Sequence, residues 1–246
     1  MKKLPIDAKA FGWFFSLVFL GFTNLNAAVP VEQIQGTFHD LSPRNYDGSM
    51  DNQICAFCHT PHGSSSYFSG APLWNKGNPL RTSFTLYGAT APDTAGETMA
   101  GTLSTATLNP ASAVCLSCHD GVSGINSIVN VAGTGGYVAT GQYVNYNGNY
   151  TPVNLSGLFA VGQSGDLTND HPVSIPYRGD EATPPAGLRP TNFVLTEWVG
   201  ATTIADLLRD GYVECGSCHN PHARSATFLK TDNNKASKVC IACHDK

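Results

Sequence analysis

The stretch Cys215-Gly-Ser-Cys218-His219-Asn-Pro-His222 is followed, close to the end of the chain, by Cys240-Ile-Ala-Cys243-His244. Both stretches contain the pattern C-x-x-C-H. Two further copies precede them, Cys55-Ala-Phe-Cys58-His59 and Cys115-Leu-Ser-Cys118-His119. The four copies contain all eight cysteines of the 246-residue chain. Because chance does not place every cysteine in one pattern, we expect the chain to be built around the group that this pattern binds.

The spacing of C-x-x-C-H is that of covalent haem c attachment. Two cysteines three residues apart lie on one face of a helical turn, so both thiols can add to the vinyl groups of one haem. The histidine that follows then lies under the iron as its proximal ligand. We therefore expect four haem c groups per chain. The predicted attachment residues are Cys55, Cys58, Cys115, Cys118, Cys215, Cys218, Cys240 and Cys243, and the predicted proximal ligands are His59, His119, His219 and His244.

Other uses of paired cysteines explain the pattern less well. Zinc ribbons contain C-x-x-C pairs but do not require a histidine after each second cysteine. Structural disulfides suit an exported protein, but they do not account for four identical units. Redox-active C-x-x-C sites belong to thioredoxin-like βαβ patterns, and no such pattern is visible in this sequence.

Four histidines lie outside the motifs, which equals the number of distal ligands that four six-coordinate irons require. They are His39, His62, His171 and His222. Outside the first few residues only Met50 and Met99 could replace them. We predict that all four are distal ligands and that the haems have low potentials, as two imidazoles favour. With no position left open for a substrate, the sequence predicts an electron carrier and not an enzyme.

The chain contains an internal repeat. Each half has a lone histidine, then a C-x-x-C-H-x-P-H unit, then a C-x-x-C-H-D unit, and the halves span about 28–165 and 166–246. Within C-x-x-C-H-x-P-H the two histidines are too close for both to bind opposite sides of one iron, so His62 and His222 should serve neighbouring haems. We expect His62 to serve the haem on Cys115 and Cys118, and His222 to serve the haem on Cys240 and Cys243.

The N-terminus is typical of an export signal. Lys2, Lys3 and Lys9 precede an apolar stretch at 11–22 that is shorter than the roughly 20 residues of a membrane span. We expect residues 1–27 to be a signal peptide, residues 28–246 to form the tetrahaem domain, and no membrane span to follow. Charged residues make up only 13% of the chain and the net charge is −4, which argues against nucleic-acid binding.

The rest of the sequence predicts a loop-rich multihaem cytochrome fold, with few short helices at the motifs, little β-structure and stacked haems as its core. Asn109-Pro110 should begin a helix that ends at His119. We also expect helices at 50–59, 203–210 and 235–244, and a small hairpin within 136–146. The stretch 121–165 carries no charge. It is either a glycine-rich surface loop or a surface that meets another subunit.

These motifs resemble the doubled-motif multihaem cytochromes c, and among them the OmcE-type tetrahaem cytochromes, which polymerise into extracellular conducting filaments. The likeness lies in the motifs and in the contexts of the other histidines: Phe38-His39-Asp40-Leu41, Cys55 to His62, Cys115 to Gly121, Asp170-His171-Pro172-Val173, Cys215 to His222, and Cys240 to His244. The resemblance implies bis-histidine haems stacked without a break, and a homopolymer assembled head to tail.

Three functions remain open at the level of the sequence. The first is the filament subunit, which carries electrons from envelope cytochromes to extracellular acceptors. The second is a monomeric periplasmic tetrahaem shuttle, although transient docking usually uses a charged patch and this chain has little charge. The third is a small multihaem reductase, which would require one haem with an open position and therefore one misassigned histidine.

Overall fold

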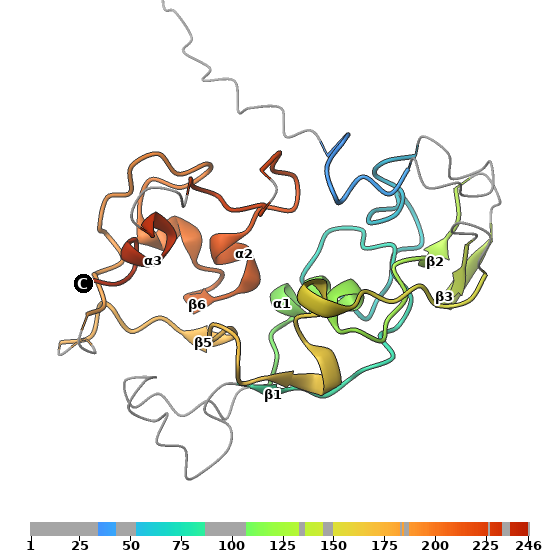
Figure 1. Cartoon of the computed structure of the whole chain (residues 1–246), viewed down its shortest axis with the longest axis horizontal. Coiled ribbons are helices and arrows are strands. Elements are labelled where there is room, and N and C mark those ends of the chain that lie inside the picture. Colours follow the sequence, from blue (N-terminus) through green and yellow to red (C-terminus); the bar gives the residue numbers. More distant parts are fainter. Residues whose placement is uncertain are drawn as a thin grey trace, which may run out of the picture. The chain divides into compact units, whose positions relative to one another are not determined.

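The computed structural model describes residues 34–42, 53–86, 107–132, 136–144, 150–182, 184, 187–225, 227–232 and 237–245. Residues 32–246 form one compact unit. Most of its described chain is loop, with short helices and two-stranded sheets (Figure 1). The predicted loop-rich fold is confirmed. The predicted signal peptide lies outside the described residues.

The longest helix is α1, Pro110–His119, which carries the second C-x-x-C-H motif. Asn109 precedes it in an extended conformation and Pro110 occupies its first turn, as the sequence predicts. The Asn109 side chain does not cap the helix, however; its amide donates to Glu214 Oε1 at 2.7 Å. Asp120 ends the helix, and Gly121 follows with a φ of +75°, a left-handed conformation that glycine adopts without strain.

Three short helices occur among the described residues of the second half. They are the 3₁₀ helix η4, Ile204–Leu207, and the single-turn helices α2, Cys215–Cys218, and α3, Lys238–Ile241. The helix expected at 203–210 is thus only one 3₁₀ turn, and Leu208 after it is already extended. Residues 54–58 form turns and not the expected helix. Two further 3₁₀ turns are η2, Gly157–Phe159, and η3, Gln163–Gly165.

In the described part of the chain the strands form three separate pairs. Strand β2, Ser127–Asn130, pairs antiparallel with β3, Tyr137–Tyr143. The expected hairpin therefore has its first strand before residue 136. Strand β1, Thr85–Leu86, pairs parallel with β4, Asp166–Leu167, and β5, Ile175–Pro176, pairs antiparallel with β6, Tyr212–Val213.

Two small hydrophobic clusters lie beside the motif cysteines. Phe57, Ile125 and Ile128 belong to the first, against which Cys58 and Cys118 pack. Ile204 and Leu207 belong to the second, against which Cys243 packs. No helix among the described residues is long and apolar enough to cross a membrane.

Candidate haem-binding site

Cysteines of different motifs are neighbours in the fold. Contact with Cys215 and burial raise the pKa of Cys115. Burial raises the pKa of Cys58 to about 11, and the thiol of Cys118 adds to this shift. Burial also raises the pKa of Cys218, with a smaller contribution from Cys240. The fold therefore brings the attachment points of the four motifs into one connected series.

The first and third motifs are supported by the same arrangement of backbone. After the first motif the chain returns so that the Asn75 amide donates to Cys58 O at 2.8 Å and Thr60 N donates to Leu73 O at 2.9 Å. After the third motif Lys230 N donates to Cys218 O at 2.9 Å and Asn220 N donates to Phe228 O at 2.7 Å. We call these segments, 72–75 and 227–230, the return loops. Their equivalence gives structural support to the internal repeat.

Five of the eight histidine rings point Nδ1 at a backbone carbonyl oxygen. For the proximal candidates the distances are 2.8 Å from His59 to Pro72, 2.7 Å from His119 to Phe159, and 3.0 Å from His219 to Thr227. The two others are His39 to Pro221 at 2.9 Å and His171 to Pro172 at 3.0 Å. Since a carbonyl only accepts, Nδ1 carries the proton and Nε2 is left as a lone-pair donor, the state in which histidine binds a metal.

Three pairs of histidine rings lie close together, with interplanar angles of 75°, 21° and 70° in the order given below. The ring centres are 6.2 Å apart for His39 and His119, 6.4 Å for His59 and His222, and 6.5 Å for His171 and His244. Two imidazoles on opposite sides of one ion, each with a metal–nitrogen bond of about 2 Å, have centres roughly 6 Å apart. The separations fit an iron between the rings of each pair. The remaining two histidines are His62 and His219.

This arrangement differs from the ligand pairing expected from the sequence. His119 faces His39 and not His62, and His244 faces His171 and not His222. His222 instead faces His59, across the two halves of the chain. The sequence argument that His222 cannot serve its own haem agrees with this geometry, and the pairing expected from the sequence stays a prediction beside the one that these rings favour. Sequence spacing could not find it, because the partner depends on how the two return loops are arranged in space.

Aromatic side chains pack on two of the candidate ligands. Phe228 stacks on His39 with ring centres 4.1 Å apart and an interplanar angle of 22°. Trp74 lies edge-on to His59 at 5.4 Å, and its indole nitrogen donates to Ser117 Oγ at 3.1 Å. Burial lowers the pKa of both His39 and His119, which favours the neutral imidazole that metal ligation requires.

The sequence analysis missed two buried charged residues next to the motifs. Glu214 is 3% exposed and lies immediately before Cys215, while Lys76 is 1% exposed and follows the first return loop. The Lys76 ammonium group donates to Ile125 O. In a chain with so few charges, an acidic residue directly before a motif was a usable signal for Glu214. Lys76 has no such signal in the sequence.

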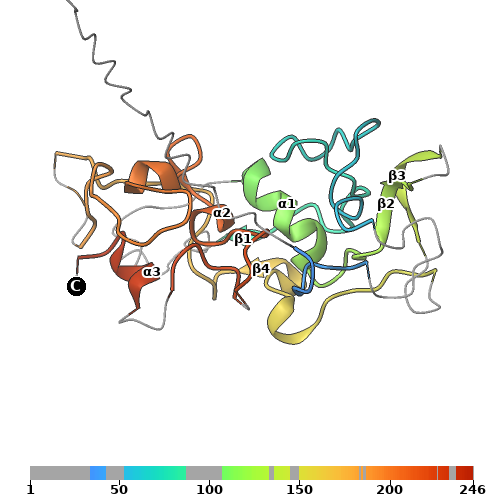
Figure 2. The ribbon, with the colours of Figure 1, turned by 90° about the horizontal axis from the view of Figure 1, so that it is seen from above.

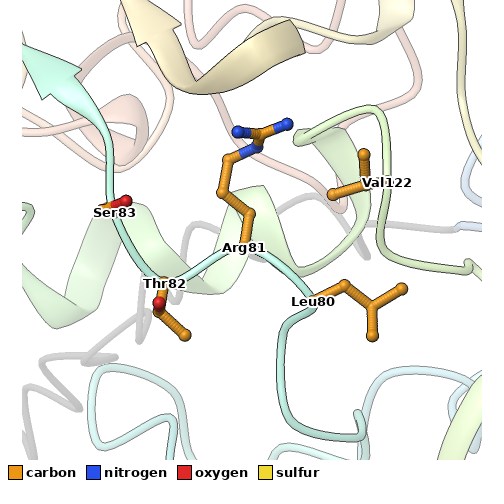
Figure 3. Close-up of a pocket in the computed structure, with 5 residues that line it drawn as sticks. All are labelled: Leu80, Arg81, Thr82, Ser83 and Val122. Carbon is orange, nitrogen blue, oxygen red and sulfur yellow. The ribbon is translucent and has the colours of Figure 1, made fainter.

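A surface pocket lies beside the loop that follows His119, and none of the candidate haem residues lines it. Its lining residues are Leu80, Arg81, Thr82, Ser83 and Val122 (Figure 3). Figure 3 shows Arg81 extended, with its guanidinium group pointing away from the side chains of Leu80 and Thr82. Its Nε atom is buried without a hydrogen-bond partner among the described residues.

Comparison with known proteins gives a family match for the segment that contains the last two motifs. Residues 208–246 match the family described as the doubled CXXCH motif. This match supports a multihaem c-type cytochrome with covalently bound c-type haem in that segment. Among curated proteins, none matches the chain.

Proposed function

We propose that the protein transfers electrons through four covalently bound haem c groups, each held between two histidines. The observation that carries this proposal is the set of facing rings 6.2 to 6.5 Å apart, with Nδ1 of His39, His59, His119 and His171 bonded to backbone carbonyls. The four C-x-x-C-H motifs supply the thioether bonds, as the sequence predicts. The haem supplies the one-electron chemistry, and the chain holds and orients it.

The distal ligands in this proposal are His39 for the haem on Cys115 and Cys118, His222 for the haem on Cys55 and Cys58, and His171 for the haem on Cys240 and Cys243. His62 and His219 then serve the haem on Cys215 and Cys218. The two C-x-x-C-H-x-P-H units thus exchange their last histidines. Each exchange ties neighbouring irons through one short peptide, which favours fast transfer between them.

With both axial positions occupied by histidine, no iron is open to a substrate, so the proposed role is electron transfer without catalysis. Reduced protein titrated with carbon monoxide tests this part. We expect no rapid binding, whereas rapid stoichiometric binding would revive the reductase alternative. Electron paramagnetic resonance of the oxidised protein should give low-spin signals only.

The proposed physiological form is a filament of identical subunits outside the cell, assembled head to tail and carrying electrons from envelope cytochromes to extracellular acceptors. Exposed apolar side chains near His39 and His119 support an interface at that end. Phe38 and Phe159 have ring centres 6.2 Å apart and are 59% and 56% exposed, and Leu158 beside them is 98% exposed. They lie in and beside a part of the chain, 121–165, that carries no charge.

Electron cryo-microscopy of the sheared extracellular fraction tests the filament. Helical filaments whose repeat is one chain, with haems continuous across the interface, are the expected result. Dispersed monomers confined to the periplasm would instead favour the soluble shuttle. Leu158→Asp with Phe159→Ser should abolish filaments and leave haem content unchanged, with Val194→Asp, another exposed apolar position, as the matched control.

A further inference from the structure

The two return loops allow a residue-by-residue comparison of the first and third motifs. Because Asn75 N and Lys230 N make the same bond to the second cysteine of each motif, Asn75 corresponds to Lys230. Lys76 therefore corresponds to Thr231. Counting back from the motifs, Glu214 before Cys215 corresponds to Ile54 before Cys55. At both equivalent places one half has a buried charge and the other half has a neutral residue.

Glu214 lies between the two halves of the chain and accepts hydrogen bonds from both. Asn109 Nδ2 donates to it at 2.7 Å, Ser174 Oγ donates to it at 3.2 Å, and Ser112 Oγ also donates to it. Ser112 belongs to α1, and Cys215 at the start of α2 donates its amide to the same hydroxyl at 3.1 Å. Figure 2 shows the two helices next to each other. The negative charge therefore lies beside the attachment residues of the second and third motifs.

Lys76 places the opposite charge beside the first motif. Its Nζ donates to the Ile125 carbonyl in the interior, and residue 76 bridges to Ile128 in the hydrophobic cluster that Cys58 contacts. At the equivalent place Thr231 is neutral and donates its hydroxyl to Glu197 O at 3.1 Å. The cation beside the third motif is Lys230, which is only half-buried, whereas Lys76 is fully buried.

We infer that Lys76 and Glu214 set the order in which equivalent haems are reduced: the haem on Cys55 and Cys58 accepts an electron before the haem on Cys215 and Cys218. The inference rests on the proposed function, since it assigns potentials to the haems proposed there. Reduction adds one electron to the iron and lowers the charge of the site by one. A fixed cation nearby therefore favours the reduced form, and a fixed anion favours the oxidised form.

The experiment is a potentiometric titration of the haem-loaded full chain, with each haem followed by its methyl resonances in paramagnetic nuclear magnetic resonance. Glu214→Gln should shift the reduction equilibrium of the haem on Cys215 and Cys218 at least tenfold toward the reduced form, which is about 59 mV for one electron. Lys76→Met should shift the haem on Cys55 and Cys58 by a similar factor in the opposite direction. Glu214→Asp keeps the charge and should restore the potential.

Asp210→Asn and Arg209→Gln are the matched controls, because they remove the same charges from side chains that are 91% and 67% exposed. Each control should shift every haem by less than threefold. Shifts no larger than the controls, or shifts of the same sign in Glu214→Gln and Lys76→Met, would overturn the inference. If the Glu214→Gln variant does not take up haem, the shift measured in Lys76→Met alone decides whether the inference holds. Missing haems or high-spin signals in the unaltered chain would instead count against the proposed function.

Discussion

The two return loops make the same contacts with different lengths of chain. In the first half, thirteen positions separate Thr60 from its partner Leu73, and in the second half eight separate Asn220 from Phe228. Leu73 and Phe228 also share a left-handed conformation, with φ of +52° and +54°. What the halves have in common is therefore the support of the proximal histidine, and what differs is the chain inserted around it.

The difference in length also separates the halves as sequences. In the second half both motifs lie within 208–246, the segment that the family model matches. In the first half they are spread over 55–119, and the chain beyond them forms the β2–β3 pair and its hydrophobic cluster. The second half is thus the compact form of the unit, and the first is the same unit with its own protein core.

The largest expected effect tests whether both halves bind haem. Cys215→Ala with Cys218→Ala should lower the haem content from four to three per chain, and Cys55→Ala with Cys58→Ala should do the same. Intact mass and the pyridine haemochrome assay measure the loss. A segment that resembles the motif but binds no haem would show no loss when its cysteines are replaced.

The next effect tests the exchange of histidines between the halves. His222→Ala should open the iron of the first motif, so that the reduced protein binds one equivalent of carbon monoxide. Adding Cys55→Ala and Cys58→Ala should abolish this binding, whereas adding Cys215→Ala and Cys218→Ala should leave it. If carbon monoxide binding is instead lost when the cysteines of the third or fourth motif are replaced, His222 serves the haem of that motif and not the haem of the first motif.

A smaller effect is expected when the residues that close the two return loops are replaced. Asn75 is fully buried, and its side chain donates to Ala56 O at 2.6 Å and Asn130 O at 2.9 Å and accepts from Asn130 N at 2.9 Å. Asn75→Ala leaves these groups unpaired and should lower the free energy of unfolding by about 2–4 kcal/mol. Lys230→Ala should change it by less than about 1 kcal/mol. Urea unfolding followed by circular dichroism measures the free energy of unfolding of both variants. Equal losses in Asn75→Ala and Lys230→Ala would contradict the expected difference between the two return loops.

The smallest effect concerns the aspartate that follows the second motif of each half. Asp120 is buried and accepts from Ser123 N and Ser123 Oγ, both at 2.6 Å, whereas Asp245 is 71% exposed and pairs with Arg189 at 2.8 Å. Asp120→Asn should cost about 1–3 kcal/mol of stability. Asp245→Asn should cost about 0–1 kcal/mol. The same urea assay measures the loss of stability in both variants. Only the loss caused by Asp245→Asn should become smaller at high salt, because salt screens an exposed ion pair.

The sequence could predict the features that depend on local spacing. The helix from Pro110 to His119 follows from the proline in its first turn. The loop-rich fold follows from the many glycines and prolines and from the few segments with apolar periodicity. The helix expected at 203–210 is shorter because the chain turns extended at Leu208, and Arg209 then exchanges backbone hydrogen bonds with Tyr212, N to O at 3.0 Å and O to N at 2.9 Å. That backbone pairing after the first turn is not visible in the apolar spacing.

The candidate site was only half predictable for a similar reason. The eight cysteines and eight histidines can be counted, but the partner of each histidine is fixed by contacts between distant segments. His39, for example, is oriented by Pro221 and Phe228 in the other half of the chain. The environment of Glu214 likewise comes from Asn109, Ser112 and Ser174, none of which is near it in sequence.

The facing of His59 and His222 also bears on the entropy of the unfolded chain. An iron held by both would close a loop of more than 160 residues, since it joins positions 59 and 222. In the chain-entropy model, closing a loop of about 100 residues lowers the entropy of the unfolded chain and raises its free energy by close to 5 kcal/mol. Longer loops raise it slightly more. A protein with so little regular structure would then resist denaturation because its unfolded chain is already tied together.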